Sequence, residues 1–441
     1  MTIEDKLRSH ATYSPEKIAL KCEGKSYSYS ALFKAACLKS TELGDVTRKM
    51  VPIVATSTFD FIASYFAIHL ADAVAVPLDK ELPSSKRKQL IDTFSGKIAP
   101  EGVADILYTT GTTGKSKAVM ISHETIMADA ENLVEAQEYD GDLTFIINGP
   151  LNHIGSLSKI YPVIYTGGTI QLIDGMKDIN RFFEVIDDAN TKVATFLVPA
   201  CIRMLLTFAK DKLTSYANKI DFIETGAAPM PLEDMRLLCQ VLPQTRLYNT
   251  YASTETGIIS TFNYNDGECL AGCLGTPMKQ SSFFITEDGF VGCKGKTLMT
   301  GYWNDTETTA KVLKDGTIIT ADLGSIDMKG RLRLHGRRDD VINVGGYKIA
   351  PTEVEDIALA FSGVKDCICI EAPHPVVGKV LKLLIVPDIN YNRKSLVNFL
   401  RSKLESHKVP VLYDEIAEVR RTFNGKRMTK KAKNSRFELL F

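Results

Sequence analysis

Short apolar segments that alternate with helical patterns constrain the fold of this chain more than any other feature. The strand-like segments lie at residues 49–55, 73–77, 143–147, 169–173, 193–198, 222–225 and 247–250. Helical patterns separate several of them, for example at residues 59–70. Strands that alternate with helices indicate βα units and a mostly parallel sheet, which binds ligands at the carboxyl ends of its strands. The sequence therefore predicts the α/β fold class, with parallel or mixed sheets and helices.

The character of the sequence changes after this region. From about residue 269 to residue 335, many glycines and short β-like segments predict a β-rich subdomain. Residues 336–340 form a charged joint, and a separate α+β pattern of about a hundred residues, the size of a small domain, follows it. We predict a large N-terminal domain at residues 1–338 and a small mobile α+β domain at residues 339–441. Residues 80–100 are charged and are expected to be irregular.

Charge and cysteine usage exclude some classes of function. The 53 basic and 53 acidic residues give a formal net charge of zero, so the charge balance favours neither nucleic acid nor a membrane surface. The N-terminus is polar, unlike a signal peptide, and His69 and Asp72 interrupt the most apolar segment. The nine cysteines show no paired spacing, and free thiols fit a reducing cytosol. We expect a cytoplasmic protein with no membrane span and no nucleic-acid partner.

Residues 108–117 read Tyr-Thr-Thr-Gly-Thr-Thr-Gly-Lys-Ser-Lys and follow a strand-like segment. Glycines let the backbone approach a ligand closely, while N–H groups, threonine hydroxyls and lysine can contact phosphate oxygens. The segment is not a Walker A loop, which needs glycine where Thr109 stands. It predicts a phosphate site of another kind, although a flexible surface loop can have the same composition. Segments 225–228 and 251–255 also follow strand-like segments, so the three could meet at one crevice.

A series of motifs occurs in the order found in the adenylate-forming superfamily. The motifs are YTTGTTGKSKAV, TGAAP, YASTETG, the Asp322 region, GRRDDVINVGGYKIAPTEVE and TFNGK. The chain resembles this superfamily from about residue 15 onward. Its members include acyl- and aryl-CoA synthetases, adenylation domains of nonribosomal peptide synthetases, and luciferase. The resemblance implies an enzyme that activates a carboxylic acid with ATP and Mg²⁺.

The resemblance assigns the phosphate loop to the β- and γ-phosphates of ATP. The residues of this site would be Thr109, Thr110, Gly111, Thr112, Thr113, Gly114 and Lys117. Ser116 stands where the family usually has proline, and Ala118 where it usually has glycine. These departures make the loop a weaker match than most.

Two further motifs match the base and the metal side of the nucleotide. In the resemblance, the segment Gly226, Ala227 and Ala228 lets a flat adenine lie against the backbone, and the Tyr251 ring stacks on it. Thr254 would hydrogen-bond the α-phosphate. Glu255 would help to hold Mg²⁺, a hard cation that prefers carboxylate oxygen.

The motifs beyond residue 320 match residues that complete the reaction. Asp322 resembles the aspartate that accepts the ribose hydroxyls, and Arg337 an arginine on the ribose and phosphate side. Lys426 resembles the lysine that contacts both the carboxylate and the α-phosphate, and a cation between two anions stabilises the transition state. Asp339 matches the hinge about which the small domain would swing, so that Gly345 and its neighbours face the site and admit a thiol.

The segment PLNHIGS bears on the identity of the acid. His153 resembles the histidine that guards the path between acid and thiol in acyl- and aryl-CoA ligases. Ile154 stands where amino-acid-activating relatives carry an aspartate, and a buried ammonium without a carboxylate would be costly, so we expect an acid without an α-amino group. Lys159 is expected to be a solvent-facing helical residue. Alternatively it faces the acyl pocket and pairs with a second carboxylate, as the likeness to o-succinylbenzoate-CoA ligases would suggest.

The resemblance implies an ATP-dependent acid–thiol ligase with catalytic residues Lys426, Thr254, Glu255 and His153. It would form acyl-AMP, release pyrophosphate and then transfer the acyl group to CoA. One alternative is an enzyme that loads an acid onto the phosphopantetheine of an acyl carrier protein, and another is a catalytically silent nucleotide-binding homologue. The presence of the matching residues argues against the silent homologue. Only about a hundred residues precede the phosphate loop, which leaves the oligomeric state open.

Overall fold

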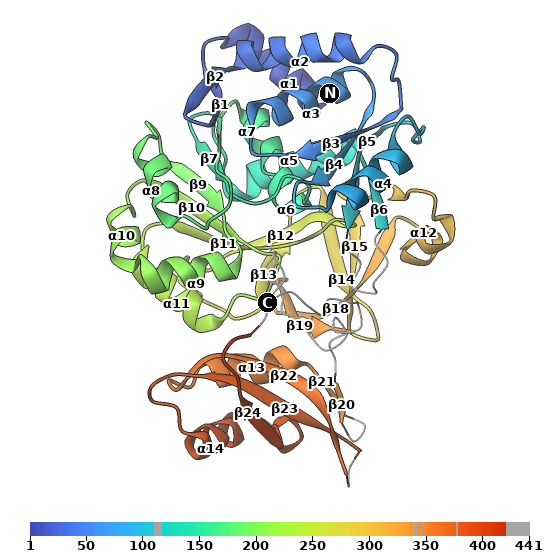
Figure 1. Cartoon of the computed structure of the whole chain (residues 1–441). Coiled ribbons are helices and arrows are strands. Elements are labelled where there is room, and N and C mark those ends of the chain that lie inside the picture. Colours follow the sequence, from blue (N-terminus) through green and yellow to red (C-terminus); the bar gives the residue numbers. More distant parts are fainter. Residues whose placement is uncertain (110–116, 339–341, 345–346, 376–377, 420–441) are drawn as a thin grey trace.

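The computed structural model describes residues 1–109, 117–338, 342–344, 347–375 and 378–419. A large N-terminal body with extensive sheets lies beside a smaller C-terminal unit, which is drawn in orange to red (Figure 1). A hydrophobic core made only of residues between Ile342 and Tyr413 shows that the smaller unit packs around its own centre. This confirms the predicted fold class. Asp339 lies outside the described residues, so the domain boundary there stays a prediction.

The largest sheet in the described part of the chain has 14 strands. Its parallel half consists, in spatial order, of β1 (Ile18–Cys22), β8 (Thr169–Leu172), β7 (Thr144–Ile147), β9 (Val193–Phe196), β10 (Ile220–Thr225) and β11 (Arg246–Ser253). β2 (Lys25–Ser28) pairs antiparallel with β1 at one edge. Most of these strands are short, apolar and buried on both faces, as strands between helix layers usually are. The strand-like segments predicted in this region are therefore confirmed.

The antiparallel half of the same sheet forms the predicted β-rich region. Its strands are β12 (Gly257–Asn263), β13 (Cys273–Pro277), β14 (Ser281–Ile285), β15 (Phe290–Gly295), β17 (Leu313–Lys314), β18 (Thr317–Ile326) and β19 (Leu332–Arg337). Helix α12 (Thr306–Val312) lies at its edge (Figure 1). β12 folds back antiparallel on β11, so the β-rich region continues the parallel sheet directly.

A second sheet of five strands carries the two ends of the Gly/Thr segment. Its order is β16 (Gly301–Tyr302), β6 (Lys117–Ser122), β5 (Val103–Thr109), β4 (Val74–Asp79) and β3 (Met50–Ala55). β5 and β6 are antiparallel, and Thr109 faces Lys117 across the pair. The Gly/Thr segment therefore joins two strands of a different sheet from the one that holds β10 and β11. The sequence does not predict this division.

Helices cover both sheets of the large body. They are α1 (Ile3–Tyr13), α2 (Tyr29–Leu43), α3 (Phe59–Leu70), α4 (Ser84–Phe94), α5 (His123–Gln137), α6 (Ile154–Leu157), α7 (Ile160–Thr166), α8 (Ile179–Asp187), α9 (Pro199–Phe208), α10 (Lys210–Ser215) and α11 (Leu232–Val241). The prediction that residues 80–100 are irregular is wrong, because α4 occupies much of this segment. Leu90 and Phe94, four residues apart, both point into the core and anchor a helix whose other side chains are mostly polar. No helix in the described ranges is long and apolar enough to cross a membrane.

The smaller unit contains β20 (Ile342–Val344), β21 (Tyr347–Ile349), α13 (Pro351–Leu359), β22 (Val364–His374), β23 (Gly378–Pro387), α14 (Arg393–Lys403), a 3₁₀ turn (Ser406–Lys408) and β24 (Leu412–Glu415). Polar contacts join it to the large body. Arg203 of α9 lies 3.7 Å from the carboxylate of Asp366, and Thr352 donates a hydrogen bond of 3.2 Å to the carbonyl oxygen of His335.

A buried polar network ties the N-terminal helix to the second sheet. His69 Nδ1 lies 2.6 Å from Glu4 Oε1, and His69 Nε2 lies 3.0 Å from Asp105 Oδ1. Tyr65 donates a 2.8 Å hydrogen bond to the other oxygen of Asp105. Burial alone would lower the pKa of His69, but the two carboxylates raise it to about 10. A protonated His69 thus joins α1 and α3 to β5, the strand that enters the Gly/Thr segment.

Candidate functional site

Three of the predicted nucleotide residues meet at the end of β11. The hydroxyl of Tyr251 donates a 2.7 Å hydrogen bond to Asp322 Oδ2, and Arg337 Nε lies 3.0 Å from Asp322 Oδ1. Asp322 on β18 and Arg337 on β19 are direct cross-strand partners, so the register of that pair brings them together. Burial, together with the negative charge of Asp322, holds the pKa of Tyr251 far above its usual value, so the phenol remains a donor. The structure thus places an aromatic ring beside a carboxylate and a cation.

Thr320 also belongs to this cluster. Its hydroxyl lies 3.3 Å from the hydroxyl of Tyr251 and accepts a 3.1 Å hydrogen bond from the backbone N–H of Asp322. Thr320 was not selected from the sequence, although it stands two residues before Asp322. Side chains alternate along a strand, so Thr320 and Asp322 point to the same face. Thr320 could have been predicted from this spacing.

A second contact chain joins the phosphate-loop strands to the turn after β11. Lys117, the first residue of β6, donates a 3.3 Å hydrogen bond to the hydroxyl of Tyr302, which donates one of 3.1 Å to Glu255 Oε1. The ammonium of Lys117 also lies 4.6 Å from the centre of the Tyr302 ring. Burial and the charge of Glu255 raise the pKa of Tyr302 well above its usual value. Tyr302 was not predicted, because it lies on a two-residue strand far from Lys117 in sequence.

The turn that carries Thr254 and Glu255 is held by hydrogen bonds to its backbone. The hydroxyl of Ser253 accepts a 3.0 Å hydrogen bond from the N–H of Thr256, and the N–H of Met299 donates one of 2.8 Å to the carbonyl oxygen of Glu255. Gly257 ends the turn at φ +63°, and a Cβ there would lie 2.3 Å from the carbonyl oxygen of Thr297. Only glycine fits this position. Thr254 is half-buried in the same turn.

The segment predicted to contact adenine directly follows β10. Gly226 is buried, and a Cβ on it would lie 3.0 Å from the carbonyl oxygen of Thr250 and 3.5 Å from the Phe196 ring. Ala227 has φ +66°, an uncommon conformation for a residue with a side chain. Ala227 is exposed and Ala228 is half-buried. A small residue is therefore required at 226, where the segment approaches the end of β11.

The PLNHIGS segment lies across Phe196 from this turn. His153 is the N-cap of the short helix α6, and both His153 and Ile154 are half-buried. A Cβ on Gly155 would lie 3.6 Å from the Phe196 ring. Phe196 therefore stands between α6 and Gly226, and its ring forms an apolar wall between the two predicted segments.

The expectation that Lys159 faces solvent is wrong. Its side chain is 2% exposed and that of Glu224 is 0% exposed. The ammonium donates a 2.8 Å hydrogen bond to Glu224 Oε1 and lies 2.7 Å from Oε2. Lys159 is buried because it stands between two short helices that pack on the sheet, where β10 supplies its partner. Nearby, burial raises the pKa of Asp129 to about 8, and the charge of Lys159 opposes this shift.

Some predicted residues lie outside the described parts of the chain. They are Thr110, Gly111, Thr112, Thr113, Gly114, Asp339, Gly345 and Lys426. Thr109 is described as the last residue of β5, and its hydroxyl donates to the carbonyl oxygen of Lys117 at 3.5 Å. The roles assigned to all of these residues stay predictions.

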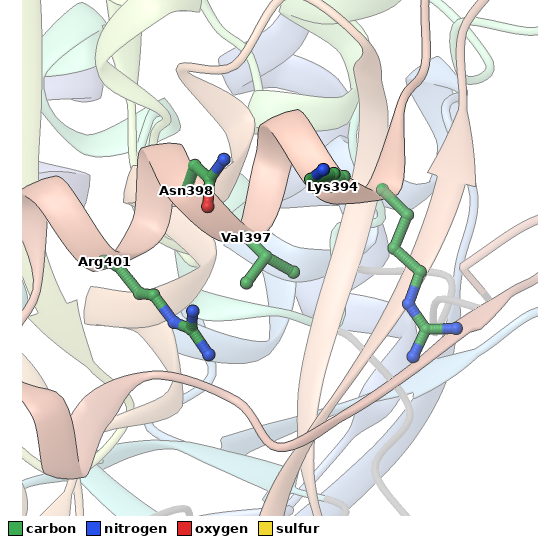
Figure 2. Close-up of a pocket in the computed structure, with 5 residues that line it drawn as sticks. Lys394, Val397, Asn398 and Arg401 are labelled. Atoms are coloured by element: carbon green, nitrogen blue, oxygen red, sulfur yellow. The ribbon is translucent and has the colours of Figure 1, made fainter.

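A groove of about 430 Å³ lies elsewhere, on the smaller unit. It is lined by Arg393, Lys394, Val397, Asn398 and Arg401, which all belong to α14 (Figure 2). None of the predicted site residues contributes to it. Its exposed arginines and lysine are those of a solvated helix face, and we assign it no role.

Comparisons with known proteins identify the family to which the chain belongs. The family model described as AMP-binding enzyme matches residues 93–303, and the model of the AMP-binding enzyme C-terminal domain matches residues 353–426. Together they cover well over half of the chain. A putative long chain fatty acid-CoA ligase, VraA, from Staphylococcus epidermidis is 24% identical over 98% of this chain and 98% of its own length.

Another relative is longer than this chain. The 3-[(3aS,4S,7aS)-7a-methyl-1,5-dioxo-octahydro-1H-inden-4-yl]propanoyl:CoA ligase of Mycobacterium tuberculosis is 27% identical over 71% of this chain. The match spans only 62% of that ligase.

Solved structures share the fold. The o-succinylbenzoate CoA synthetase of Bacillus subtilis, in complex with the acyl-adenylate OSB-AMP, superimposes with a TM-score of 0.84 at 23% identity and covers 99% of both chains. The same enzyme has also been solved with ATP and a magnesium ion, and that structure gives a TM-score of 0.82 over 96% of this chain and 97% of its own. From the matching family models and these relatives, we conclude that the chain belongs to the AMP-binding enzymes of the adenylate-forming superfamily, of the acyl- and aryl-CoA synthetase type.

Proposed function

We propose that this protein is an ATP-dependent carboxylic acid–thiol ligase. In the first step, a carboxylate oxygen of the acid attacks the α-phosphorus of ATP, the bond to the pyrophosphate oxygen breaks, and acyl-AMP forms. In the second step, the sulfur of a thiol attacks the acyl carbon, and AMP leaves with the electrons of the broken C–O bond. The thioester is the product.

The contact chain from Lys117 through Tyr302 to Glu255 carries this proposal. It connects the strand that leaves the predicted phosphate loop with the carboxylate predicted to hold Mg²⁺, across two different sheets. A cation for phosphate oxygens and a carboxylate for a hard metal ion are the donors that MgATP needs. The cluster of Tyr251, Asp322 and Arg337 lies at the other end of the same turn. Together with Lys117 and Glu255, these side chains fit a nucleotide with its metal ion.

The residues predicted from the sequence receive the following roles in the proposal. Glu255 would hold Mg²⁺, which would neutralise charge on the phosphates, while Lys117 would contact the departing pyrophosphate. Asp322 accepts the ribose hydroxyls, and Arg337 orients its carboxylate from the neighbouring strand. Tyr251 offers its ring face to adenine while its hydroxyl stays bound to Asp322. Lys426 stabilises the charge that develops between carboxylate and α-phosphate.

We propose an apolar acid without an α-amino group. The Phe196 ring beside Gly155 and Gly226 supplies an apolar wall, and the half-buried Ile154 offers no carboxylate for an ammonium. The pairing of Lys159 with Glu224 argues against a second carboxylate on the substrate, because this ammonium is already neutralised inside the protein. Breaking the pair to admit a new anion would leave Glu224 buried without a partner.

CoA is the proposed acceptor, since the relatives are described as CoA ligases, while a carrier-protein phosphopantetheine remains the alternative acceptor. The test is a pyrophosphate-release assay over aliphatic, aryl and amino acids, each with and without CoA. We expect release with an apolar monocarboxylic acid and thioester only when CoA is present. Lys426→Ala should abolish acid-dependent release. If no acid stimulates release of pyrophosphate, the chain binds nucleotide without turnover and the proposal is wrong.

Asp322→Asn tests the nucleotide site separately. Removal of a charged acceptor costs about 1.5–3 kcal/mol, so the KM for ATP should rise roughly 10- to 150-fold. Asp327→Asn is the matched control, because Asp327 lies in the turn that follows the same strand and pairs with Arg331 rather than with the cluster. An unchanged KM for ATP in Asp322→Asn would contradict the ribose role.

A further inference from the structure

Three metal-ligating side chains meet in the large body, outside the candidate nucleotide site. Glu4 lies in the first turn of α1, His69 in the last turn of α3, and His123 is the first residue of α5. One carboxylate oxygen of Glu4 and one ring nitrogen of each histidine all lie within 4.8 Å of one another. The three residues are far apart in sequence, so folding is what brings them together.

The distances between these atoms are close to those of a zinc site. His69 Nδ1 lies 2.6 Å from Glu4 Oε1, and His123 Nδ1 lies 3.7 Å from Glu4 Oε2. Zn²⁺ binds imidazole nitrogen and carboxylate oxygen at about 2.0–2.2 Å, so two of its tetrahedral ligands are about 3.4 Å apart. To admit the ion, the carboxylate of Glu4 would have to move away from His69 by about 0.8 Å, which rotation of its own side-chain bonds can supply.

The Nδ1 atom of His123 faces this carboxylate without bonding to it. Among the described residues, none forms a hydrogen bond with this buried nitrogen, and 3.7 Å to Glu4 is too long for one. A buried polar atom without a partner costs free energy, and a bound ion is one of the partners that accounts for such an atom. The side chain of His123 is 23% exposed, so an ion can enter from solvent along its ring.

The ring of His69 is held from its other side by a second carboxylate. His69 Nε2 lies 3.0 Å from Asp105 Oδ1, and Tyr65 donates a 2.8 Å hydrogen bond to the other oxygen of Asp105. A histidine that binds a metal ion usually donates its second N–H to a carboxylate, which fixes the tautomer and directs the first nitrogen to the metal. His69 therefore already has the outer partner of a metal-bound imidazole.

We propose that Glu4, His69 and His123 bind a divalent transition-metal ion, with Zn²⁺ as the best fit. Two imidazoles and one carboxylate suit Zn²⁺ and its neighbours such as Co²⁺, whereas Mg²⁺ prefers oxygen ligands. A water molecule would complete the four ligands from the exposed side of His123. In the metal-free protein a proton lies between His69 Nδ1 and Glu4, and binding of the ion releases this proton to solvent.

The ion would join three helices and lie apart from the predicted Mg²⁺ site. His123 directly follows β6, and Lys117 is the first residue of that strand, so the two are about 20 Å apart. Lys117 is the residue that connects to Glu255 through Tyr302. Because the ligands come together in the folded chain, binding should raise the stability of the large body by mass action.

The test titrates chelator-treated, full-length protein with Zn²⁺ and with Co²⁺, whose visible absorption bands report a four-coordinate site. We expect one ion per chain and Co²⁺ bands that added Zn²⁺ abolishes. At a Zn²⁺ concentration 100-fold above the dissociation constant, the Tm should rise by about 3–5 °C. Mg²⁺ at the same concentration should neither displace Co²⁺ nor raise the Tm.

His123→Gln is the decisive variant. The Nδ1 atom of His123 makes no hydrogen bond with the described residues, so the metal-free Tm of this variant should stay close to that of the unaltered protein. Its affinity for Co²⁺ should fall by more than about 100-fold, whereas Asp105→Asn, which alters an outer partner, should reduce it by about 10- to 100-fold. His335→Gln is the matched control, because His335 is exposed and lies 2.8 Å from the Ser325 hydroxyl.

Other outcomes would overturn the proposal. Absence of the Co²⁺ bands in the unaltered protein would show that the three side chains do not bind a metal ion. Bands of equal strength in His123→Gln would place the ion elsewhere on the chain, and unchanged affinity in Asp105→Asn would contradict the outer role of that carboxylate. None of these readouts depends on ligase activity, so they are independent of the proposed function.

Discussion

Replacing Lys159 with methionine should destabilise the large body strongly. The ammonium lies 2.8 Å from one oxygen of Glu224 and 2.7 Å from the other, and both side chains are almost completely buried. Methionine fills a similar volume but leaves the carboxylate of Glu224 without its ionic partner. Removal of one partner from a buried ion pair costs about 3–5 kcal/mol, because the remaining charge stays desolvated. The loss should therefore exceed that of any exposed ion pair in the chain.

The double variant Lys159→Met with Glu224→Met separates charge from packing. An apolar pair of similar size is often as stable as the ion pair that it replaces. We therefore expect the double variant to recover most of the stability that Lys159→Met loses. Lys279→Met is the matched control for a lysine removed from an ion pair, because Lys279 and Glu135 are 3.0 Å apart but more than half exposed. That control should lose at most about 1 kcal/mol.

Urea unfolding followed by tryptophan fluorescence measures these changes. The chain has one tryptophan, Trp303, which packs against Phe94 in the large body and so reports on the unit that holds Lys159. With an m-value of roughly 3 kcal/mol/M, the midpoint should fall by about 1–2 M urea in Lys159→Met. A shift no larger than that of Lys279→Met would refute the reasoning. So would a double variant that is less stable than Lys159→Met alone.

Three further predictions concern other parts of the chain. The carboxylates hold the pKa of His69 at about 10, above its usual 6.5, so its stabilising contribution is complete below pH 6.5 and is lost as the pH rises toward 10. The difference in Tm between the unaltered protein and His69→Gln should therefore shrink over this range, and a constant difference would contradict the protonated His69. Gly257→Ala should lower the free energy of unfolding by at least about 2 kcal/mol and impair pyrophosphate release, because a Cβ would meet the Thr297 carbonyl oxygen at 2.3 Å. Gly316→Ala is the control, because Gly316 has φ +67° and open space around it. Thermal unfolding of this control should show a loss of only about 1–2 kcal/mol. Asp339→Pro should spare acyl-AMP formation and reduce thioester formation, and equal loss of both half-reactions would contradict a hinge at this residue.

Much of the fold follows from local patterns in the sequence. β7, β9 and β10 are continuous apolar segments because helices cover both faces of the parallel sheet, and such segments can be recognised without knowledge of their neighbours. Helix α4 was not predicted, because Leu90 and Phe94 are the two residues that mark its buried side among many polar residues. The division of the strands between two sheets depends on pairings between distant segments, which local patterns do not contain.

The candidate site, like the fold, could be predicted only in part from the sequence. Asp322 and Glu255 could be selected because each stands in a recognisable motif. The contact of Tyr302 with Glu255 and Lys117 could not, since it depends on a short strand that packs beside β6. Lys159 was misplaced because a lysine in a helix is usually exposed, and its partner Glu224 lies on a strand 65 residues away.

The pairing of β16 with β6 has a consequence for how the protein is made. Gly301 pairs with Met120, and Thr300 donates to the carbonyl oxygen of Met120 across a sequence separation of 180 residues. At synthesis rates of about 5–20 residues per second, the ribosome needs roughly 10–35 s to supply β16 after β6 has emerged. During that time the edge of β6 that faces away from β5 is unpaired, and an unpaired edge of a largely apolar strand is a template for association with other chains. Nascent chains should therefore be most vulnerable to aggregation, and most in need of chaperones, between the synthesis of residue 122 and that of residue 302.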